Sequence, residues 1–479
     1  MNYRMIGYLL GIIVLIEAAL MSLPMATSLI YGESVLPFVI TIAIMLAVCL
    51  PFVIFKPRNS QIYAKEGFVT VAAGWILLSV FGALPFVISG SIPSYVDAFF
   101  ETVSGFTTTG ATILGEVESL PRGILFWRSF THWIGGMGVL VFMLAILPSK
   151  GGQTMHLMRA EVPGPTKGKL VPKMRQTALI LYGIYVALTA IQVVCLLLCK
   201  MPLYDAVVNS FATAGTGGFS VLNNSIAGYN NPAAEWVIAI FMFIFGVNFN
   251  IYFFILIGKF KDAVTSEELR AYLIICFASV AAIAINTAHM FDTLGDCVRA
   301  SFFQIITIMS TTGFATTDYG LWPVFSKTIL IFLMMVGACA GSTAGGLKIS
   351  RVLILLKNIL REIKHMLRPR SVNVVRLDGE VVSDETVRSA TGYFAIYILL
   401  IVMTTLVLSV DGFSFETNFS ATLSCVNNIG PALGDIGPTG NFSVYSPFST
   451  ILLSFAMLLG RLEIMPMVIL FSPITWRKR

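Results

Sequence analysis

Long apolar runs alternate with short polar segments along the whole chain. A helix needs about 20 predominantly apolar residues to cross the ~30 Å hydrocarbon core of a bilayer, and the runs are close to that length. The pattern therefore predicts an all-α polytopic membrane protein with ten spanning helices. They are expected near residues 5–30, 35–55, 68–90, 124–147, 177–199, 234–257, 271–290, 328–347, 390–410 and 447–470.

The composition agrees with this class. Hydrophobic residues make up 56% of the 479 positions and charged residues only 12%, an apolar excess that soluble domains cannot bury. The formal net charge of +6 is spread over short loops, so no exposed basic face is available and nucleic-acid binding is excluded. The sequence also lacks HExxH, paired intramembrane carboxylates and a Ser/His/Asp set, and we therefore expect no enzyme.

The loops predict the orientation. With ten spans both termini lie on the same side, and the loops on that side hold 24 of the 31 Lys and Arg residues. By the positive-inside rule both termini are expected in the cytoplasm. On the opposite side acids outnumber bases, among them Asp97, Glu101, Asp205 and Glu416. Such an acidic face is expected to concentrate cations at the outer mouth.

Four segments between consecutive spans share one pattern when each is aligned on a glycine. The glycines are Gly110, Gly218, Gly313 and Gly430, at intervals of 108, 95 and 117 residues. A nearly constant period indicates an internal repeat, so eight of the ten spans are expected to form four helix–reentrant loop–helix units. We predict two extra N-terminal helices in 1–66, followed by pore repeats in 67–150, 151–262, 263–370 and 371–479.

Each shared segment is too short to cross the bilayer and ends in a stretch rich in Thr, Asn and Gly. Non-helical backbone at membrane depth is tolerated only where protein buries it or water fills a cavity beside it. Four such loops around one axis would supply a ring of carbonyl oxygens that replaces the hydration shell of an alkali cation. The alternative is that they are small-residue patches where helices pack closely. The candidate filter residues are Thr108, Thr109, Gly110, Thr216, Gly217, Gly218, Thr311, Thr312, Gly313, Asn428, Ile429 and Gly430.

These residues carry a resemblance to a known family. The four filter loops of the Trk-type potassium-uptake family, the TrkH/KtrB superfamily of K⁺ transporters, resemble four stretches of this chain. These are Ser-Gly-Phe-Thr-Thr-Thr-Gly-Ala-Thr at 104–112, Gly-Thr-Gly-Gly-Phe-Ser at 215–220, Ser-Thr-Thr-Gly-Phe-Ala-Thr-Thr at 310–317 and Asn-Asn-Ile-Gly-Pro-Ala-Leu-Gly at 427–434. With Trp-Ile-Gly-Gly-Met-Gly at 133–138 and the extra N-terminal spans, the chain is most similar to the bacterial TrkH-like membrane subunits.

The resemblance implies a multi-pass protein of the bacterial inner membrane that forms a homodimer with one K⁺-selective pore per protomer. It implies K⁺ as the transported ion, held at the filter residues only, and a cytosolic nucleotide-binding TrkA-like regulatory subunit as partner. The fourth copy departs from a symmetric potassium filter because it carries Asn428 and Ile429 where Thr is expected. The alternative is an alternating-access cation symporter with looser K⁺/Na⁺ selectivity, although such carriers are usually built from two repeats.

Four glycines, Gly337, Gly341, Gly345 and Gly346, fall within ten residues and are followed by Lys348. One interpretation is a closely packed helix with a GxxxG face. The other, which the resemblance favours, is a broken helix whose loop lies under the filter and moves as a gate. Lys348 lies closer to the cytoplasmic end, where its side chain can also snorkel to the surface.

Arg461 falls in the middle of the last expected span, where an arginine costs at least about 2.5–3.5 kcal/mol on the insertion scale. It is expected either to face the ion path as a barrier to cations or to form a buried ion pair with an acid elsewhere. The polar loops 351–388 and 148–176 are candidate docking surfaces for a regulatory subunit or contacts for lipid headgroups. Neither carries a phosphate-binding motif, so nucleotide control must come from a partner.

Overall fold

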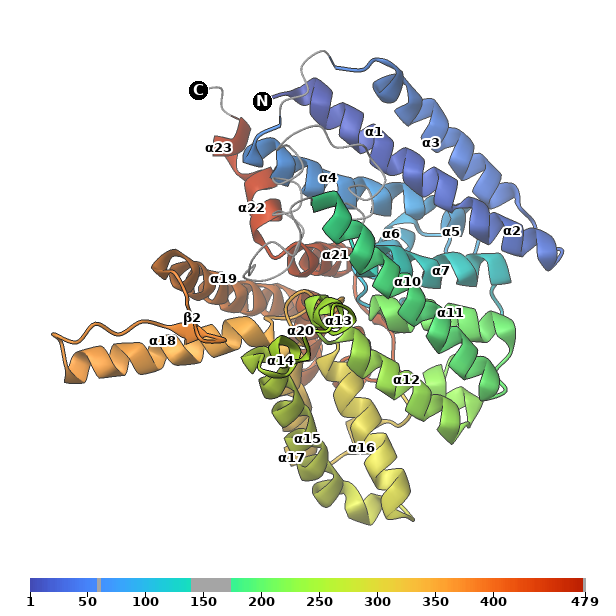
Figure 1. The fold of residues 1–479 in the computed structure, drawn as a ribbon. Coiled ribbons are helices and arrows are strands. Elements are labelled where there is room, and N and C mark those ends of the chain that lie inside the picture. Colours follow the sequence, from blue (N-terminus) through green and yellow to red (C-terminus); the bar gives the residue numbers. More distant parts are fainter. Residues whose placement is uncertain (58–61, 139–173, 477–479) are drawn as a thin grey trace.

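The computed structural model describes residues 1–57, 62–138 and 174–476, and almost all regular structure in these ranges is helical. The chain starts with a helical hairpin, in which α1 (Tyr3–Leu20) and α2 (Ser22–Ile30) form one arm and α3 (Leu36–Ile54) the other. Figure 1 shows this hairpin along one edge of the molecule, next to α4 (Ala64–Gly82) and α5 (Leu84–Ile88).

Four shorter helices follow at intervals along the chain. They are α6 (Tyr95–Phe106), α11 (Leu203–Gly215), α16 (Leu294–Met309) and α20 (Phe415–Asn427). The helices before them are α4 with α5, α10 (Met174–Leu198), α15 (Glu267–Thr287) and α19 (Asp384–Leu408). The helices after them are α7 (Arg122–Gly136), α12 (Pro232–Phe245), α17 (Val324–Val336) and α21 (Pro447–Arg461).

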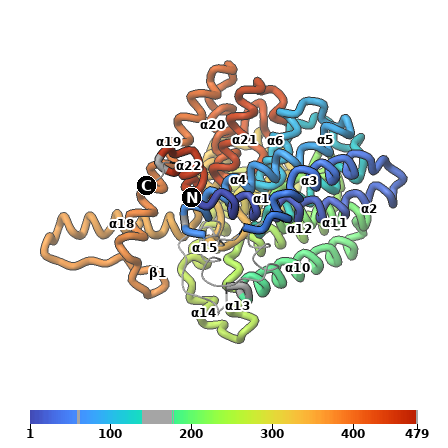
Figure 2. The backbone as a smooth tube through the Cα atoms, turned by 90° about the horizontal axis from the view of Figure 1, so that it is seen from above, coloured from blue at the N-terminus to red at the C-terminus, as the bar shows by residue number. Residues whose placement is uncertain are grey.

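The remaining elements are short or lie at the periphery. They are α13 (Phe249–Leu256), α14 (Phe260–Val264), α18 (Ile349–Leu367), α22 (Met465–Phe471), α23 (Pro473–Trp476), β1 (Arg376–Leu377) and β2 (Glu380–Val381), with short 3₁₀ turns between them. β1 and β2 pair antiparallel, with Arg376 opposite Val381. Figures 1 and 2 both show α18 extending away from the rest of the molecule.

Three of the four shorter helices begin where the sequence supplies a capping side chain. Ser94, Thr293 and Ser414 each accept a hydrogen bond from the backbone N–H three residues later. Each first turn also carries an acid, which stabilises the positive end of the helix dipole. These acids are Asp97, Asp205, Asp296 and Glu416. The acids expected on the outer face therefore also stabilise helix N-termini.

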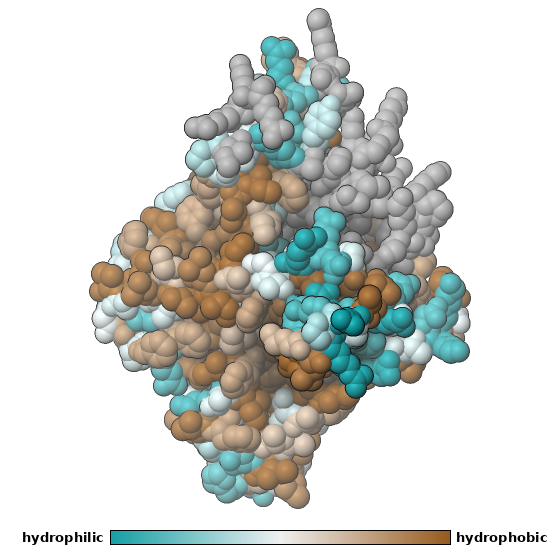
Figure 3. Space-filling view, turned by 90° about the vertical axis from the view of Figure 1, so that its left-hand side faces the viewer, coloured by the Kyte–Doolittle hydropathy of each residue, from teal (hydrophilic) through white to brown (hydrophobic). Residues whose placement is uncertain are grey.

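Six helical stretches in the described ranges are long and apolar enough to cross a bilayer. They are Tyr3–Ile30, Leu36–Ile54, Lys65–Ile88, Ala178–Leu198, Glu267–Met290 and Asp384–Asp411. α12 and α13 together form a further candidate, but the chain bends by 89° between them. Hydrophobic side chains cover a broad area of the face shown in Figure 3, as expected for a surface in contact with lipid.

The prediction of unbroken spans at 234–257, 328–347 and 447–470 is wrong. α12 ends at Phe245, α17 at Val336 and α21 at Arg461. The chain leaves α17 through Gly337 (φ 69°) and turns after α21 through Glu463 (φ 53°) and Ile464 (φ 63°), and left-handed residues of this kind end a right-handed helix. The expected span 124–147 also ends early, because α7 stops at Gly136. Residues 139–147, most of the loop 148–176 and the expected boundary at 150 lie outside the described residues.

Candidate functional site

Each of the four shorter helices ends in the same backbone motif. After α6, Thr108 adopts a left-handed conformation, its N–H donates to Gly105 O (3.1 Å), and the N–H of Thr109 donates to Ser104 O (2.8 Å). The same two hydrogen bonds recur at Thr216 and Gly217, at Thr311 and Thr312, and at Asn428 and Ile429. This is a Schellman cap, in which glycine usually occupies the left-handed position.

Here the left-handed position holds three threonines and one asparagine. Thr108, Thr216 and Thr311 have φ of 56° and Asn428 has φ of 55°. A left-handed conformation costs an L-residue about 1–2 kcal/mol, and most for a β-branched side chain. Backbone strain of this kind concentrates at functional sites, where the surrounding structure maintains it.

The four loops close into a ring through their glycines. Gly110, Gly218, Gly313 and Gly430 have φ of 79°, 77°, 88° and 101°. A Cβ on the first would lie 1.9 Å from Gly217 O, on the second 2.1 Å from Thr312 O, on the third 2.1 Å from Ile429 O and on the fourth 2.6 Å from Thr109 O. Each loop abuts the next and the fourth abuts the first. The structure therefore brings all twelve candidate filter residues together.

Side chains reinforce the ring. Thr107 shares a hydrogen bond with Thr109 (2.8 Å), and Ser310 shares the equivalent bond with Thr312 (2.7 Å). Asn428 Nδ2 donates to Thr109 Oγ1 (3.0 Å), which ties the fourth loop to the first. The sequence pattern marked Asn428 only as a departure from Thr, and its bridging amide was missed.

The ring is suited to binding a cation that has lost its water. Carbonyl groups of Thr109, Gly217, Thr312 and Ile429 border it, and four helix C-termini, the negative ends of their dipoles, stop within four residues of its glycines. Carbonyl dipoles at close range replace the hydration shell of an alkali ion.

The glycine-rich segment 337–348 is not helical, so the GxxxG-helix interpretation is wrong. Gly337, Gly341, Gly346 and Lys348 all have positive φ, between 69° and 80°. The segment lies against the ring: Gly345 N–H donates to Thr311 Oγ1 (2.7 Å), and a Cβ on Gly345 would lie 2.2 Å from Asn427 O.

Side chains from other helices hold this segment. The buried carboxylate of Glu268, on α15, accepts hydrogen bonds from the N–H groups of Ala340 (2.7 Å), within the segment, and Ser350 (3.1 Å), just after it. Arg461 Nη1 donates to Thr343 O (2.8 Å). No pattern in the sequence pointed to Glu268, because its partners lie more than 70 residues away.

Arg461 also reaches α7. Its Nη2 donates to Gly135 O (2.6 Å) and Gly136 O (2.8 Å), the last carbonyls of that helix. The guanidinium thus lies among carbonyl oxygens of the glycine-rich segment and of a helix C-terminus, where a positive charge is favoured. The sequence analysis expected Arg461 either to face the ion path or to form a buried ion pair, and neither expectation included these three hydrogen bonds.

Lys348 and Glu101 also differ from expectation. Lys348 is 2% exposed and its ammonium donates to Ala344 O, so it does not snorkel to the surface. Glu101 is 1% exposed and accepts a hydrogen bond from Arg128 Nε (2.6 Å), so it adds nothing to an exposed acidic face. Glu463, close in sequence to Arg461, instead pairs with Arg351 of α18 (2.5 Å).

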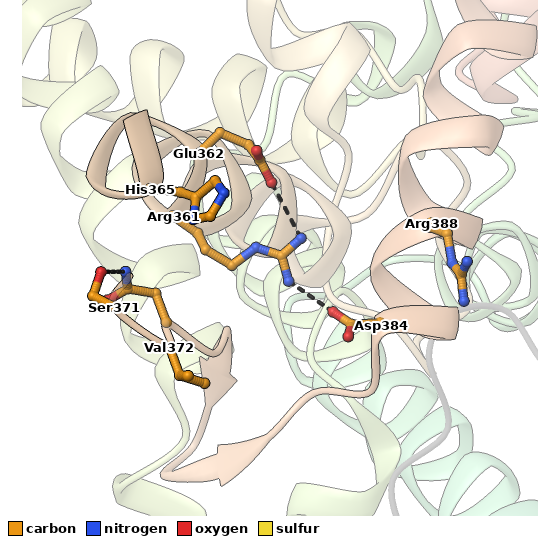
Figure 4. A pocket seen from close by; sticks show the side chains of 8 residues that line it. Arg361, Glu362, His365, Ser371, Val372, Asp384 and Arg388 are labelled. Carbon is orange, nitrogen blue, oxygen red and sulfur yellow. Dashed lines mark hydrogen bonds and ion pairs between the residues drawn. The ribbon is translucent and has the colours of Figure 1, made fainter. Parts of the chain in front are cut away.

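A polar cavity of about 500 Å³ lies apart from the ring, between α18 and α19. Arg361 on α18 pairs with Asp384 (2.8 Å) and Glu362 (3.3 Å), as Figure 4 shows, so two carboxylates offset its charge. His365 and Arg388 also line the cavity. The cavity falls within the 351–388 region expected to act as a docking surface or lipid contact.

The apolar spans together with the buried ring define the class as a polytopic α-helical membrane protein, in agreement with the sequence prediction. A family model described as "TrkH: Cation transport protein" matches residues 36–478. The chain belongs to this family, and the resemblance inferred from the loop motifs is confirmed.

The similarity to individual relatives extends over the full length. The chain is 34% identical over 486 residues to the "Trk system potassium uptake protein TrkH" of Salmonella typhimurium, covering 100% of both chains. It is 36% identical over 484 residues to the "Trk system potassium uptake protein TrkG" of Escherichia coli K12, covering 99% of each. The crystal structure of the potassium transporter TrkH from Vibrio parahaemolyticus matches with a TM-score of 0.88 at 31% identity, covering 100% of both chains.

Proposed function

We propose that this chain is the potassium-conducting membrane subunit of a Trk-type uptake system. The names of its full-length relatives support potassium as the ion. The observation that carries the proposal is the closed ring, in which each of four loops of one conformation sets a backbone carbonyl against the glycine of a neighbouring loop.

In this proposal K⁺ sheds its water at the ring and is coordinated by backbone carbonyls of the twelve filter residues. The loops come from repeats 67–150, 151–262, 263–370 and 371–479, after the two N-terminal helices in 1–66. Two backbone hydrogen bonds tie each strained cap to the end of its own helix, so the carbonyls are arranged before the ion arrives. Preorganised dipoles of this kind favour an ion whose size matches them.

We further propose that the segment 337–348, with Gly337, Gly341, Gly345, Gly346, Lys348 and Arg461, gates the path. Its contact with Thr311 and Asn427 supports a position next to the ring. A cytosolic nucleotide-binding TrkA-like subunit would control it by docking on the 351–388 region, which includes most of the projecting helix α18. A homodimer in the bacterial inner membrane, with both termini in the cytoplasm, completes the proposal.

The alternating-access symporter is not favoured. Carriers of that kind place one midplane site between two repeats. Here four loops meet one another in cyclic order around a single ring, with no second constellation of that form in the described residues.

The test is ion flux into liposomes that contain only the purified chain. K⁺ and Rb⁺ uptake should exceed Na⁺ and Li⁺ uptake and should not require an imposed proton gradient. Equal uptake of K⁺ and Na⁺ would contradict the filter assignment. Uptake that occurs only with a proton gradient would instead support the symporter.

A further inference from the structure

One face of α7 contacts two adjacent loops of the ring. Arg128 and His132 are four residues apart, so their side chains lie on the same face of the helix. They are 3% and 0% exposed. α7 packs against both α6 and α11, the helices that end at the first and second loops (Figure 1).

His132 joins α6, the helix before the first loop, to the second loop. Its Nδ1 lies 2.7 Å from Gly105 O, and its Nε2 lies 3.3 Å from Phe219 N. A carbonyl oxygen can only accept and a backbone N–H can only donate, so Nδ1 carries the proton and Nε2 accepts. A Cβ on Gly217 would lie 2.3 Å from the imidazole, so the His132 side chain packs directly on the backbone of the second loop.

Arg128 joins the same two loops through residues that follow their ring glycines. Its Nε donates to Glu101 Oε1 (2.6 Å) and its Nη1 to Ser220 O (3.1 Å), while its guanidinium carbon lies 3.5 Å from the centre of the Phe219 ring. Glu101 in turn accepts from Ile113 N–H (3.1 Å), just beyond the first loop's glycine. The Arg128–Glu101 ion pair therefore connects the chain segments that follow the ring glycines of the first and second loops.

This corner of the ring differs from the other three. Glu101 stands nine residues before its ring glycine, and the equivalent positions of the other loops hold Asn209, Gln304 and Ala421. Of these four residues, only Glu101 can form an ion pair with an arginine. A buried charge pair with fixed fork geometry restrains its partners more strongly than neutral hydrogen bonds do.

We propose that Arg128 and His132 are positioning residues that set the ion preference of the ring. They fix the backbone of the second loop relative to the first, and with it the spacing of carbonyl oxygens at that corner. The inference rests on the proposed function, because it concerns the preference of an ion-conducting ring. Selectivity depends on the number and field of the coordinating carbonyls, so a shift of one loop alters preference before it blocks flux.

The experiment measures K⁺ and Na⁺ influx into liposomes containing the full-length chain. The variants are His132→Phe, which keeps an aromatic ring but removes both hydrogen bonds, and His132→Gln, whose amide offers an NH₂ group as donor and a carbonyl oxygen as acceptor. Trp133→Phe is the matched control, because Trp133 Nε1 donates to Thr189 Oγ1 on α10 (3.3 Å) and not to a loop of the ring. We expect the K⁺/Na⁺ ratio to fall at least about tenfold in His132→Phe and to stay within about twofold of wild type in the other two.

The outcomes distinguish failure of the proposed function from failure of the positioning role. A wild-type chain without K⁺ preference would refute the proposed function, and the inference with it. With a selective wild type, an unchanged ratio in folded His132→Phe, or an equal fall of both fluxes, would overturn the positioning role alone. If His132→Phe does not fold, Arg128→Lys decides, because one ammonium cannot replace the guanidinium fork to Glu101 and Ser220. A wild-type ratio in that variant would also overturn the role.

Discussion

The ring and the glycine-rich segment 337–348 are both non-helical backbone packed inside the protein, yet they are held differently. The ring repeats one cap four times, and backbone–backbone hydrogen bonds fix each copy. The segment occurs once and has no repeated cap. Besides backbone bonds such as that from Lys348 N–H to Val336 O, it is held by side chains of other elements, among them Glu268, Thr311 and Arg461. Backbone bonds of a cap persist together, whereas side-chain bonds can be released singly. Under the proposed function, this difference would let the ring keep its ion preference while the segment moves.

The largest effect is expected from Gly110→Ser. The new Cβ would lie 1.9 Å from Gly217 O at a residue with φ of 79°, so the loop must shift. Strain of about 1–3 kcal/mol corresponds to a loss of about five- to a hundred-and-fiftyfold in the K⁺/Na⁺ flux ratio. The control is Gly183→Ala on α10, where the new Cβ would meet no other element within 4 Å among the described residues. The same loss is expected at Gly218, Gly313 and Gly430, and wild-type ratios at all four would disprove the ring.

Arg461→Gln acts on the segment and not on the ring. It removes the bond to Thr343 O and the tie to α7, each charged hydrogen bond contributing about 1.5–3 kcal/mol. K⁺ flux without a partner should rise about tenfold, with the K⁺/Na⁺ ratio unchanged. Arg270→Gln is the control, because this exposed arginine donates to the carbonyls of Thr265 and Ser266 at the start of α15. A lower melting temperature without faster flux would show a purely structural role.

Thr311→Val tests the contact between the two regions. It removes the hydroxyl that accepts from Gly345 N–H (2.7 Å) while keeping a β-branched side chain. Losing one hydrogen bond of about 1 kcal/mol should raise basal flux about fivefold. Thr108→Val makes the same change at the equivalent position of the first loop, where the hydroxyl has no partner among the described residues, and should leave flux unchanged. Equal effects in the two variants would show that the contact does not restrain the segment.

Ser414→Ala should have the smallest functional effect. Ser414 caps the N-terminus of α20, at the end remote from the ring. Removing an N-cap costs about 1 kcal/mol of stability, so the melting temperature should fall while the flux ratio stays at the wild-type value. Ser409→Ala, on an exposed turn, should change neither quantity. A changed ratio in Ser414→Ala would mean that the ring is less independent of its supporting helices than the repeated caps indicate.

The sequence predicted the fold class and the residues of the ring because both depend on local, repeated patterns. Apolar runs predicted the helical membrane class, and the alignment on glycines selected the twelve residues that the structure brings together. Their role in coordinating ions stays a prediction. The breaks after α12 and α21 were missed, because the apolar residues on both sides outweigh the few polar ones at the breaks, such as Asn248 and Glu463.

The long-range hydrogen bonds that hold the site could not be predicted from the sequence. Arg461 bonds to a carbonyl 326 residues away, and Asn428 bonds to Thr109 across 319 residues. Hydrophobic periodicity reports which face of an element is buried, not which distant element it meets. Glu268 and His132 gave no local signal, and only the assembled fold shows what they hold.

The most direct test of the central claim is diffraction from crystals of the full-length chain grown in Rb⁺, recorded at the rubidium absorption edge. If the four loops form the ion-coordinating ring, anomalous peaks should lie on the axis enclosed by Thr109, Gly217, Thr312 and Ile429, within coordination distance of their carbonyl oxygens. Crystals grown in Na⁺ should lack them. Rubidium peaks elsewhere in the membrane region, with none inside the ring, would contradict the account.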